Sequence, residues 1–166
     1  MNKRKRGAGM PQSEADALPE CVCGALRTVT RAITQIYDDA MRPSGLRVTQ
    51  FGLLSRISRL QPVSAARLVD SLHADQTTLA RALKLLEGEG LVRRAAQADR
   101  RLKRIELTAA GERKLAEARK LWTGAQARMV ALIGERQWRD ARSRLGALLA
   151  AVENKDRAAK FILGPF

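Results

Sequence analysis

Aromatic residues, histidine and cysteine are all scarce in this chain of 166 residues. It contains three Phe, two Trp and one Tyr, together with one His and two Cys. Two cysteines cannot build a disulfide scaffold and suggest a reducing compartment. A single histidine leaves little material for acid–base or nucleophilic catalysis. Because single-strand binders need aromatic stacking platforms, the shortage of rings favours a duplex as any nucleic-acid partner.

Long apolar runs and the signatures of common catalytic sites are also missing. The longest apolar run, Leu145 to Val152, has eight residues, whereas crossing a bilayer takes about 18 or more. The basic segment Lys3–Arg6 is not followed by the apolar stretch of a secretory signal. No phosphate-binding loop, GxSxG or HExxH motif occurs. We therefore expect a cytoplasmic protein that is not an enzyme and needs no cofactor or metal.

Positive charge, in contrast, is abundant. The chain has 31 Lys and Arg against 17 Asp and Glu, a net charge of +14. Such a surplus favours a polyanionic partner, with nucleic acid ahead of an anionic membrane. A merely solvated basic surface is the alternative. The hydrophobic content of 45% and charged content of 29% are typical of a folded domain rather than a disordered chain.

The spacing of apolar residues predicts a mainly helical fold with one small β-hairpin. Steps of three and four indicate helices at 18–41, 48–60, 65–72, from 76 to Gly88 or Gly90, at 109–133 and around 138–152. Ser64, Asp75 and Thr108 are predicted N-caps, and Thr49 is a further candidate. Residues 91–92 and 104–107 indicate two strands joined by a polar hairpin.

Two short helices joined by a tight turn and followed by a hairpin describe a winged helix-turn-helix. This arrangement places the N-terminal part of its second helix in the DNA major groove. The predicted base-contacting residues on that helix are Gln76, Thr77, Thr78, Arg81 and Lys84. The hairpin from Arg93 to Arg104 has six basic residues and one acidic residue, which suits the negative potential of a narrow minor groove. The predicted minor-groove residues at its tip are Asp99, Arg100 and Arg101.

Four segments of the chain resemble the MarR (multiple antibiotic resistance regulator) family. They are LRVTQFGLLSRI, VSAARLVDSL, QTTLARALKLLEGEGLVRR and, most specifically, ADRRLKRIELTAAG. The resemblance covers about residues 18–153 and implies a homodimer whose two winged lobes bind a pseudo-palindromic DNA operator. It implies a repressor, less often an activator, that responds to a small molecule or an oxidant. It also implies phosphate contacts by Ser64, Arg67, Arg93, Arg94 and Lys103.

The predicted organisation has four parts, with the dimer body formed by both ends of the chain. They are a flexible basic tail at 1–16, an N-terminal dimerisation helix at 17–45, the winged DNA-binding domain at 46–108, and C-terminal dimerisation helices and tail at 109–166. The apolar surface of the terminal helices exceeds what one small lobe can cover, which agrees with dimerisation.

Cys21 and Cys23 leave two interpretations open. Residues two apart on a helix point about 200° away from each other, so a disulfide within one helix is not expected. A helix N-terminus stabilises a thiolate, and Cys21 pairing with a thiol of the other subunit would sense oxidants. Alternatively, both are small packing residues.

Two further questions concern an effector and rival functions. Candidate effector-pocket residues are the large side chains of Tyr37, Phe51, His73 and Trp122, each of which also fits simple core packing. The rival functions are a sequence-independent, nucleoid-type DNA-binding protein and a winged-helix module that binds protein or RNA. A specificity ratio for DNA in the presence of competitor discriminates among them.

Overall fold

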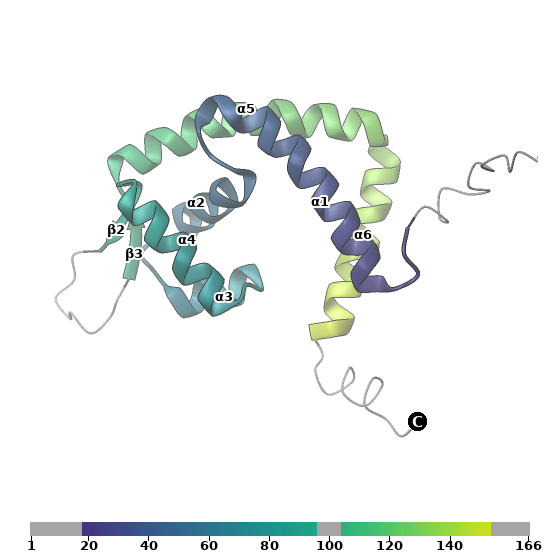
Figure 1. Ribbon diagram of the computed structural model, residues 1–166, viewed down its shortest axis with the longest axis horizontal. Coiled ribbons are helices and arrows are strands. Elements are labelled where there is room, and N and C mark those ends of the chain that lie inside the picture. The colour runs from purple at the N-terminus through teal and green to yellow at the C-terminus, as the bar shows by residue number, and fades with distance from the viewer. Residues whose placement is uncertain (1–17, 96–103, 154–166) are drawn as a thin grey trace, which may run out of the picture. The chain divides into compact units, whose positions relative to one another are not determined.

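The computed structural model describes residues 18–95 and 104–153, and its contacts divide the chain into two units that meet between Trp122 and Thr123. The mainly helical class is confirmed. The elements in chain order (Figure 1) are α1 (Val22–Met41), the 3-10 turn η2 (Arg42–Ser44), α2 (Val48–Leu60), β1 (Val63–Ser64), α3 (Ala65–Leu72), α4 (Gln76–Gly88), β2 (Val92–Arg94), β3 (Arg104–Leu107), α5 (Ala109–Ile133) and α6 (Glu135–Glu153). None of the described helices is long and apolar enough to cross a membrane.

The predicted hairpin is confirmed as β2 and β3, but the sheet has a third strand. The strand order is β1-β3-β2, and both pairings are antiparallel. In the first pairing Val63 lies opposite Ile105. The side-chain oxygen of Gln61 accepts a hydrogen bond from the backbone N–H of Leu107 at 2.8 Å, which ties the end of α2 to β3. A two-residue strand is too short to show alternation, so the sequence pattern missed β1.

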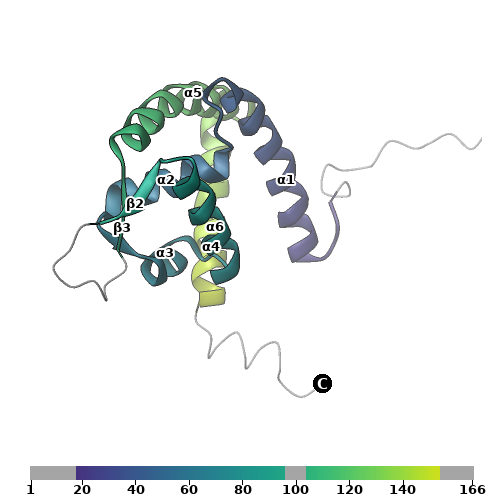
Figure 2. The same ribbon diagram turned by 60° about the vertical axis from the view of Figure 1, so that its left-hand side comes forward.

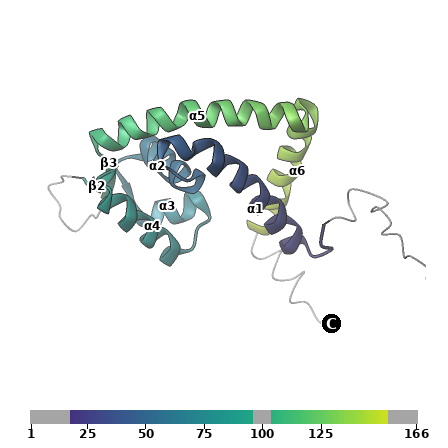
Figure 3. The same cartoon turned by 45° about the horizontal axis from the view of Figure 1, so that its top comes forward.

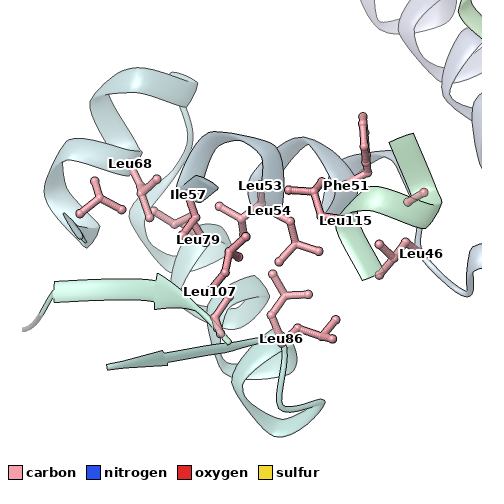
Figure 4. Packing of buried hydrophobic residues seen from close by; sticks show 14 of the residues in the cluster. Leu46, Phe51, Leu53, Leu54, Ile57, Leu68, Leu79, Leu86, Leu107 and Leu115 are labelled. Carbon is pink, nitrogen blue, oxygen red and sulfur yellow. The ribbon is translucent and has the colours of Figure 1, made fainter. Parts of the chain in front are cut away.

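The first unit has a closed hydrophobic core around α2. Leu54, Ile57, Leu68 and Leu86 are fully buried, and they come from α2, α3 and α4. Figure 4 shows these side chains meeting between the helices and the strand that carries Leu107. The core therefore holds the helix-turn-helix and the sheet as one lobe.

Three of the predicted N-caps are confirmed. The Ser64 hydroxyl accepts from the Arg67 N–H at 3.3 Å, and the Asp75 carboxylate accepts from the Thr78 N–H at 2.8 Å. The Thr108 hydroxyl accepts from the Gly111 N–H at 3.0 Å. Each cap satisfies a backbone donor that the first turn of its helix leaves free.

The prediction of Thr49 as a cap is wrong, because the residue that caps α2 lies two positions earlier in the chain. Arg47 is its N-cap, and the Arg47 N–H donates to the side chain of Gln50 at 2.8 Å. The Val48 N–H donates to a carboxylate oxygen of Asp38 at 2.7 Å. Asp38 belongs to α1, so the donor of one helix is satisfied from another, an arrangement that local sequence does not reveal.

The first helix is shorter than predicted and begins at Val22. Its N-cap is Cys21, in an extended conformation. The ring of Pro19 lies against Gly24, 3.2 Å from where a Cβ would stand on that glycine. Residues 18–21 therefore lie beside the first turn of α1 rather than continuing it.

The second unit contains the end of α5 and all of α6. Gly134 separates the two helices with a φ of 94°, a conformation that favours glycine, so the predicted break is confirmed. Helix α6 begins at Glu135, three residues before the apolar pattern starts at Trp138. None of its side chains is buried.

Candidate nucleic-acid interface

Helices α3 and α4 form the expected helix-turn-helix, with His73 and Ala74 in the turn. His73 has a φ of 48° and a ψ of 38°, a left-handed conformation that ends α3. The Ala74 N–H donates to the carbonyl of Val69 at 3.1 Å. Figure 2 shows α4 beside α3, with β2 and β3 toward the left of the view. The turn thus ends α3 and leads directly into α4.

The face of α4 opposite the core carries three of the predicted base-contacting residues. Leu79 and Leu86 are buried and point into the lobe. Since successive residues rotate by about 100° around a helix, Thr77, Arg81 and Lys84 lie on the opposite face, and all three are exposed. This face offers hydroxyl, guanidinium and ammonium groups to a groove.

Gln76 and Thr78 flank that face at the N-terminal end of α4, and both are exposed. Asp75 precedes them, and the hydrogen bond from the Thr78 backbone N–H, followed by one from the Thr78 hydroxyl, lowers the pKa of its carboxyl group. Asp75 therefore stays ionised well below neutral pH. Its negative charge makes this helix end less hospitable to phosphate and leaves it to base edges, some of which donate hydrogen bonds.

Both arginines of β2 lie near acidic side chains. The Arg93 guanidinium donates to the Glu106 carboxylate across the hairpin at 2.9 Å, while Arg94 lies 4.0 Å from Glu87 of α4. Both arginine side chains remain 66% exposed, so they keep donors available for phosphate. The pairs orient the side chains rather than add much stability, since exposed ion pairs contribute about 1 kcal/mol or less.

The remaining predicted contacts divide between described and undescribed positions. Ser64 and Arg67 are exposed at the N-terminus of α3. The predicted minor-groove residues Asp99, Arg100 and Arg101 and the predicted phosphate contact Lys103 lie outside the described residues.

A cavity of about 650 Å³ opens between α3, α4 and the sheet. Most of its wall is apolar, with Val69, Leu79, Leu83, Val92 and Ile105 among the lining residues. Charged groups also line it, namely Asp70, Lys84, Glu87, Arg93 and Arg94. An apolar wall with a few charged groups is the usual composition of a small-molecule site of this size.

The four large side chains predicted for an effector pocket lie elsewhere. The rings of Phe51 and Trp122 are stacked with centroids 5.6 Å apart. Phe51 and Tyr37 are buried, and burial raises the pKa of the Tyr37 phenol. His73 is exposed in the turn. None of the four is among the residues that line the cavity.

Sequence reasoning missed the cavity because its wall is assembled from α3, α4, β2 and β3. The ion pair of Arg93 and Glu106 could have been predicted from the sequence, since antiparallel register places these residues opposite each other. Finding that pair required the strand boundaries, and the predicted first strand ended too early, at Val92.

Cys21 and Cys23 are both exposed and both free thiols. Burial in the core of their own chain therefore does not account for them. Within the described ranges, no group of three His, Cys, Asp or Glu residues is placed to hold a metal ion.

Comparison with known proteins links this geometry to DNA-binding regulators. Residues 46–103 match the family model described as "MarR family". The transcriptional regulator MosR of M. tuberculosis, solved in complex with DNA, is 41% identical, with 81% of this chain and 97% of that chain covered and a TM-score of 0.71. The transcriptional repressor CouR bound to a 23-mer DNA duplex is 25% identical, with 89% and 100% covered and a TM-score of 0.69.

A third similar structure carries a small molecule. It is a MarR family protein of M. tuberculosis in complex with p-aminosalicylic acid, 26% identical to this chain. The match covers 77% of this chain and 98% of that chain, with a TM-score of 0.60. Matches that span nearly the whole of each relative indicate a shared architecture beyond the winged lobe.

Proposed function

The chain belongs to the MarR family, and on that premise we propose that it is a homodimeric repressor that binds a pseudo-palindromic DNA operator and is released by an effector or by thiol oxidation. The observation that carries the proposal is the exposed face of α4, where Thr77, Arg81 and Lys84 stand opposite the buried Leu79 and Leu86. Arginine recognises guanine bidentately, and the threonine methyl group packs on the thymine methyl.

In addition to the base contacts of α4, residues of β2 and α3 are proposed to contact DNA phosphates. Arg93 and Arg94 on β2 and Arg67 on α3 are exposed. Such contacts fix the register of the protein on the duplex without reading sequence. The 41% identical MosR was solved with DNA, which supports the same partner for this chain.

Dimerisation is proposed from two apolar faces that the single chain leaves open. On α1 the exposed apolar residues are Val22, Leu26, Val29 and Ile36, and on α6 they are Leu145, Leu148, Leu149 and Val152. Their spacings of three, four and seven place each set on one helical face. Exposed apolar stripes of this kind mark interaction sites. A second copy of the chain is the occupant that a palindromic operator requires.

For the effector, we propose an amphipathic anion bound in the cavity between α3, α4 and the sheet. Leu83 and Ile105 offer apolar contact to a ring or short acyl chain, and a carboxylate would pair with Lys84. No carboxylate of the described residues lies within ion-pair distance of Lys84. Because Lys84 is also a proposed base contact, the ligand would compete with DNA. p-Aminosalicylic acid, bound to a 26% identical family member, has this chemistry.

The effector site is tested with p-aminosalicylate as the probe. Ala66 lines the cavity, and Ala66→Leu should fill part of it. We expect the acid to weaken DNA binding by the wild type but not by this variant. Ala116→Leu, at an exposed alanine of α5, is the matched control and should respond like the wild type. An equal response of the two variants would exclude this cavity.

Thiol oxidation is the other proposed release. Two thiols give one disulfide while hydrogen peroxide is reduced to two waters, so the step is balanced. Cys21 precedes α1 and Cys23 lies in its first turn, close to the apolar face proposed for dimerisation. A disulfide there would strain the first turn of α1 or link the two subunits, and a non-reducing gel separates these outcomes.

The central experiment is a gel-shift titration against the promoter region of the protein's own gene, with excess nonspecific DNA. We expect a specific complex that is lost after mild peroxide and restored by dithiothreitol. A complex indifferent to peroxide would leave the repressor proposal intact and remove its redox part. Binding with a steep salt dependence but no sequence preference would instead indicate the nucleoid-type function. A cytoplasmic location follows from the proposed partner.

A further inference from the structure

The backbone that links α4 to β2 is held by the start of α5. The Thr108 hydroxyl donates to the carbonyl oxygen of Gly90 at 2.6 Å and accepts from the Gly111 N–H at 3.0 Å. The Thr108 N–H donates to the carbonyl oxygen of Leu91 at 3.1 Å. One residue thus satisfies two carbonyls of this link and one donor of the first turn of α5.

Gly111 brings the helix even closer to the same link. A Cβ on Gly111 would lie 2.0 Å from the carbonyl oxygen of Leu91, so only glycine allows this approach. The Leu91 N–H in turn donates to the carbonyl of Leu86, in the last turn of α4, at 2.9 Å. We call residues 90, 91, 108 and 111 the joint. It connects the end of α4, the start of β2 and the start of α5.

Because α5 is long, a small rotation at the joint would produce a larger displacement at the far end of the helix. It continues without a break from Ala109 to Ile133 (Figure 3). At a rise of 1.5 Å per residue, it is roughly 36 Å long. Turning it by about 5° at the joint would displace its far end by roughly 3 Å, close to the rise of one base pair. A rotation of a few degrees at the joint would therefore shift α4 relative to the far end of α5 by about the rise of one base pair.

We propose that Thr108 is a positioning residue that sets the half-site spacing accepted by the dimer. The inference rests on the proposed function, since spacing has meaning only for two lobes on one duplex. Thr108 contacts no base in this proposal. It acts by fixing the direction in which α5 leaves the lobe relative to α4, through the hydroxyl that joins Gly90 to Gly111.

The test measures spacing preference as well as affinity. A duplex selected from a random pool by the wild-type protein is remade with one base pair removed from, or added to, its centre. The full-length wild type, Thr108→Val and Thr108→Ser are titrated against all three duplexes. Valine keeps the shape and loses both hydrogen bonds, while serine keeps the hydroxyl. Thr49→Val, at an exposed threonine of α2, is the control for the same chemical change.

For the wild type, we expect each altered duplex to bind roughly tenfold more weakly than the selected one, comparable to the cost of one mismatched base pair. Thr108→Val should reduce that ratio to about threefold or less, a loss of spacing preference beyond any general loss of affinity. Thr108→Ser and Thr49→Val should keep the wild-type ratio.

Equal weakening on all three duplexes by Thr108→Val would overturn the inference and leave a purely structural role for the residue. That result is distinguishable from failure of the proposed function. If the wild type selects no sequence from the pool, the repressor proposal fails, and the spacing inference falls with it.

Discussion

The winged lobe and the terminal helices treat their apolar residues in opposite ways. In the lobe, Leu54, Ile57, Leu68 and Leu86 are fully buried within a single chain. In α6, no residue is buried, and leucines such as Leu145 and Leu149 remain more than 40% exposed. The lobe has a closed core, whereas we propose that α6 contributes one half of the dimer interface. On that proposal, the lobe is stabilised by folding and α6 by association.

The largest effect is expected from a charge introduced on the exposed apolar face of α6. Leu149→Asp should dissociate the proposed dimer, because each copy would bury an unpaired carboxylate at an estimated cost of about 3–5 kcal/mol. Sedimentation analysis over a concentration series measures the shift to monomer, and circular dichroism should show the lobe still folded. Ala147→Asp introduces the same charge about 200° around the helix and should leave the association unchanged. A dimer that survives Leu149→Asp would place the interface elsewhere.

In the lobe, the corresponding test removes a buried apolar side chain and measures the free energy of unfolding. Leu54→Ala removes a side chain with no exposed surface and should lower the free energy of unfolding by about 3 kcal/mol, from lost apolar burial and the cavity left behind. Urea denaturation measures the change. Leu85→Ala, at a leucine of α4 that is 53% exposed, should cost about 0.5 kcal/mol or less. Similar losses for both would contradict the distinction between buried and open leucines.

A third substitution tests DNA binding separately from the stability of the dimer and the stability of the folded lobe. Arg81→Ala should weaken operator binding by about 2 kcal/mol and relax the base preference at one position, if its guanidinium contacts guanine bidentately. Gel-shift competition with single-base operator variants measures the preference. Arg113→Ala removes the same charge from the exposed surface of α5 and should weaken all duplexes slightly and equally. Unchanged base preference in Arg81→Ala would remove Arg81 from the reading face.

The smallest expected effect is the pH dependence of the α4 cap. Hydrogen bonds from Thr78 hold the pKa of Asp75 below its ordinary value of 3.8. The ionised carboxylate therefore stabilises the fold above that pH, and its contribution is lost as the pH falls through the lowered value. Asp75→Asn keeps an N-capping side chain but cannot titrate. Its melting temperature should fall less than that of the wild type between about pH 5 and pH 2, and equal falls would count against a native-state role for the carboxylate.

The helical part of the fold was predictable because its signals are local. Apolar spacing located α2, α3 and α5 within about a residue of their observed bounds, and the caps at Ser64, Asp75 and Thr108 are confirmed. The errors lie where another segment decides. Asp38 satisfies the start of α2, and Pro19 lies against Gly24 before α1 begins.

The exposed face of α4 that we propose contacts bases also followed from pattern, since residues at steps of three and four share a face. Thr77, Arg81 and Lys84 are exposed opposite the core as that pattern requires. The prediction of Tyr37, Phe51, His73 and Trp122 as effector-pocket residues stays a prediction, although none of them lines the cavity beside α4. Phe51 and Trp122 pack against each other, and the cavity is lined by residues from four separate elements.

Sequence alone determined the helical segments, the helix-turn-helix with its wing and the basic character of the surface proposed to bind DNA, because periodicity, capping and charge act over a few residues. Tertiary structure decided the third strand, the cavity beside α4 and the joint at Thr108 and Gly111. These features depend on carbonyls, donors and apolar surfaces that are distant in the chain and complement one another only after the core around Leu54 has formed.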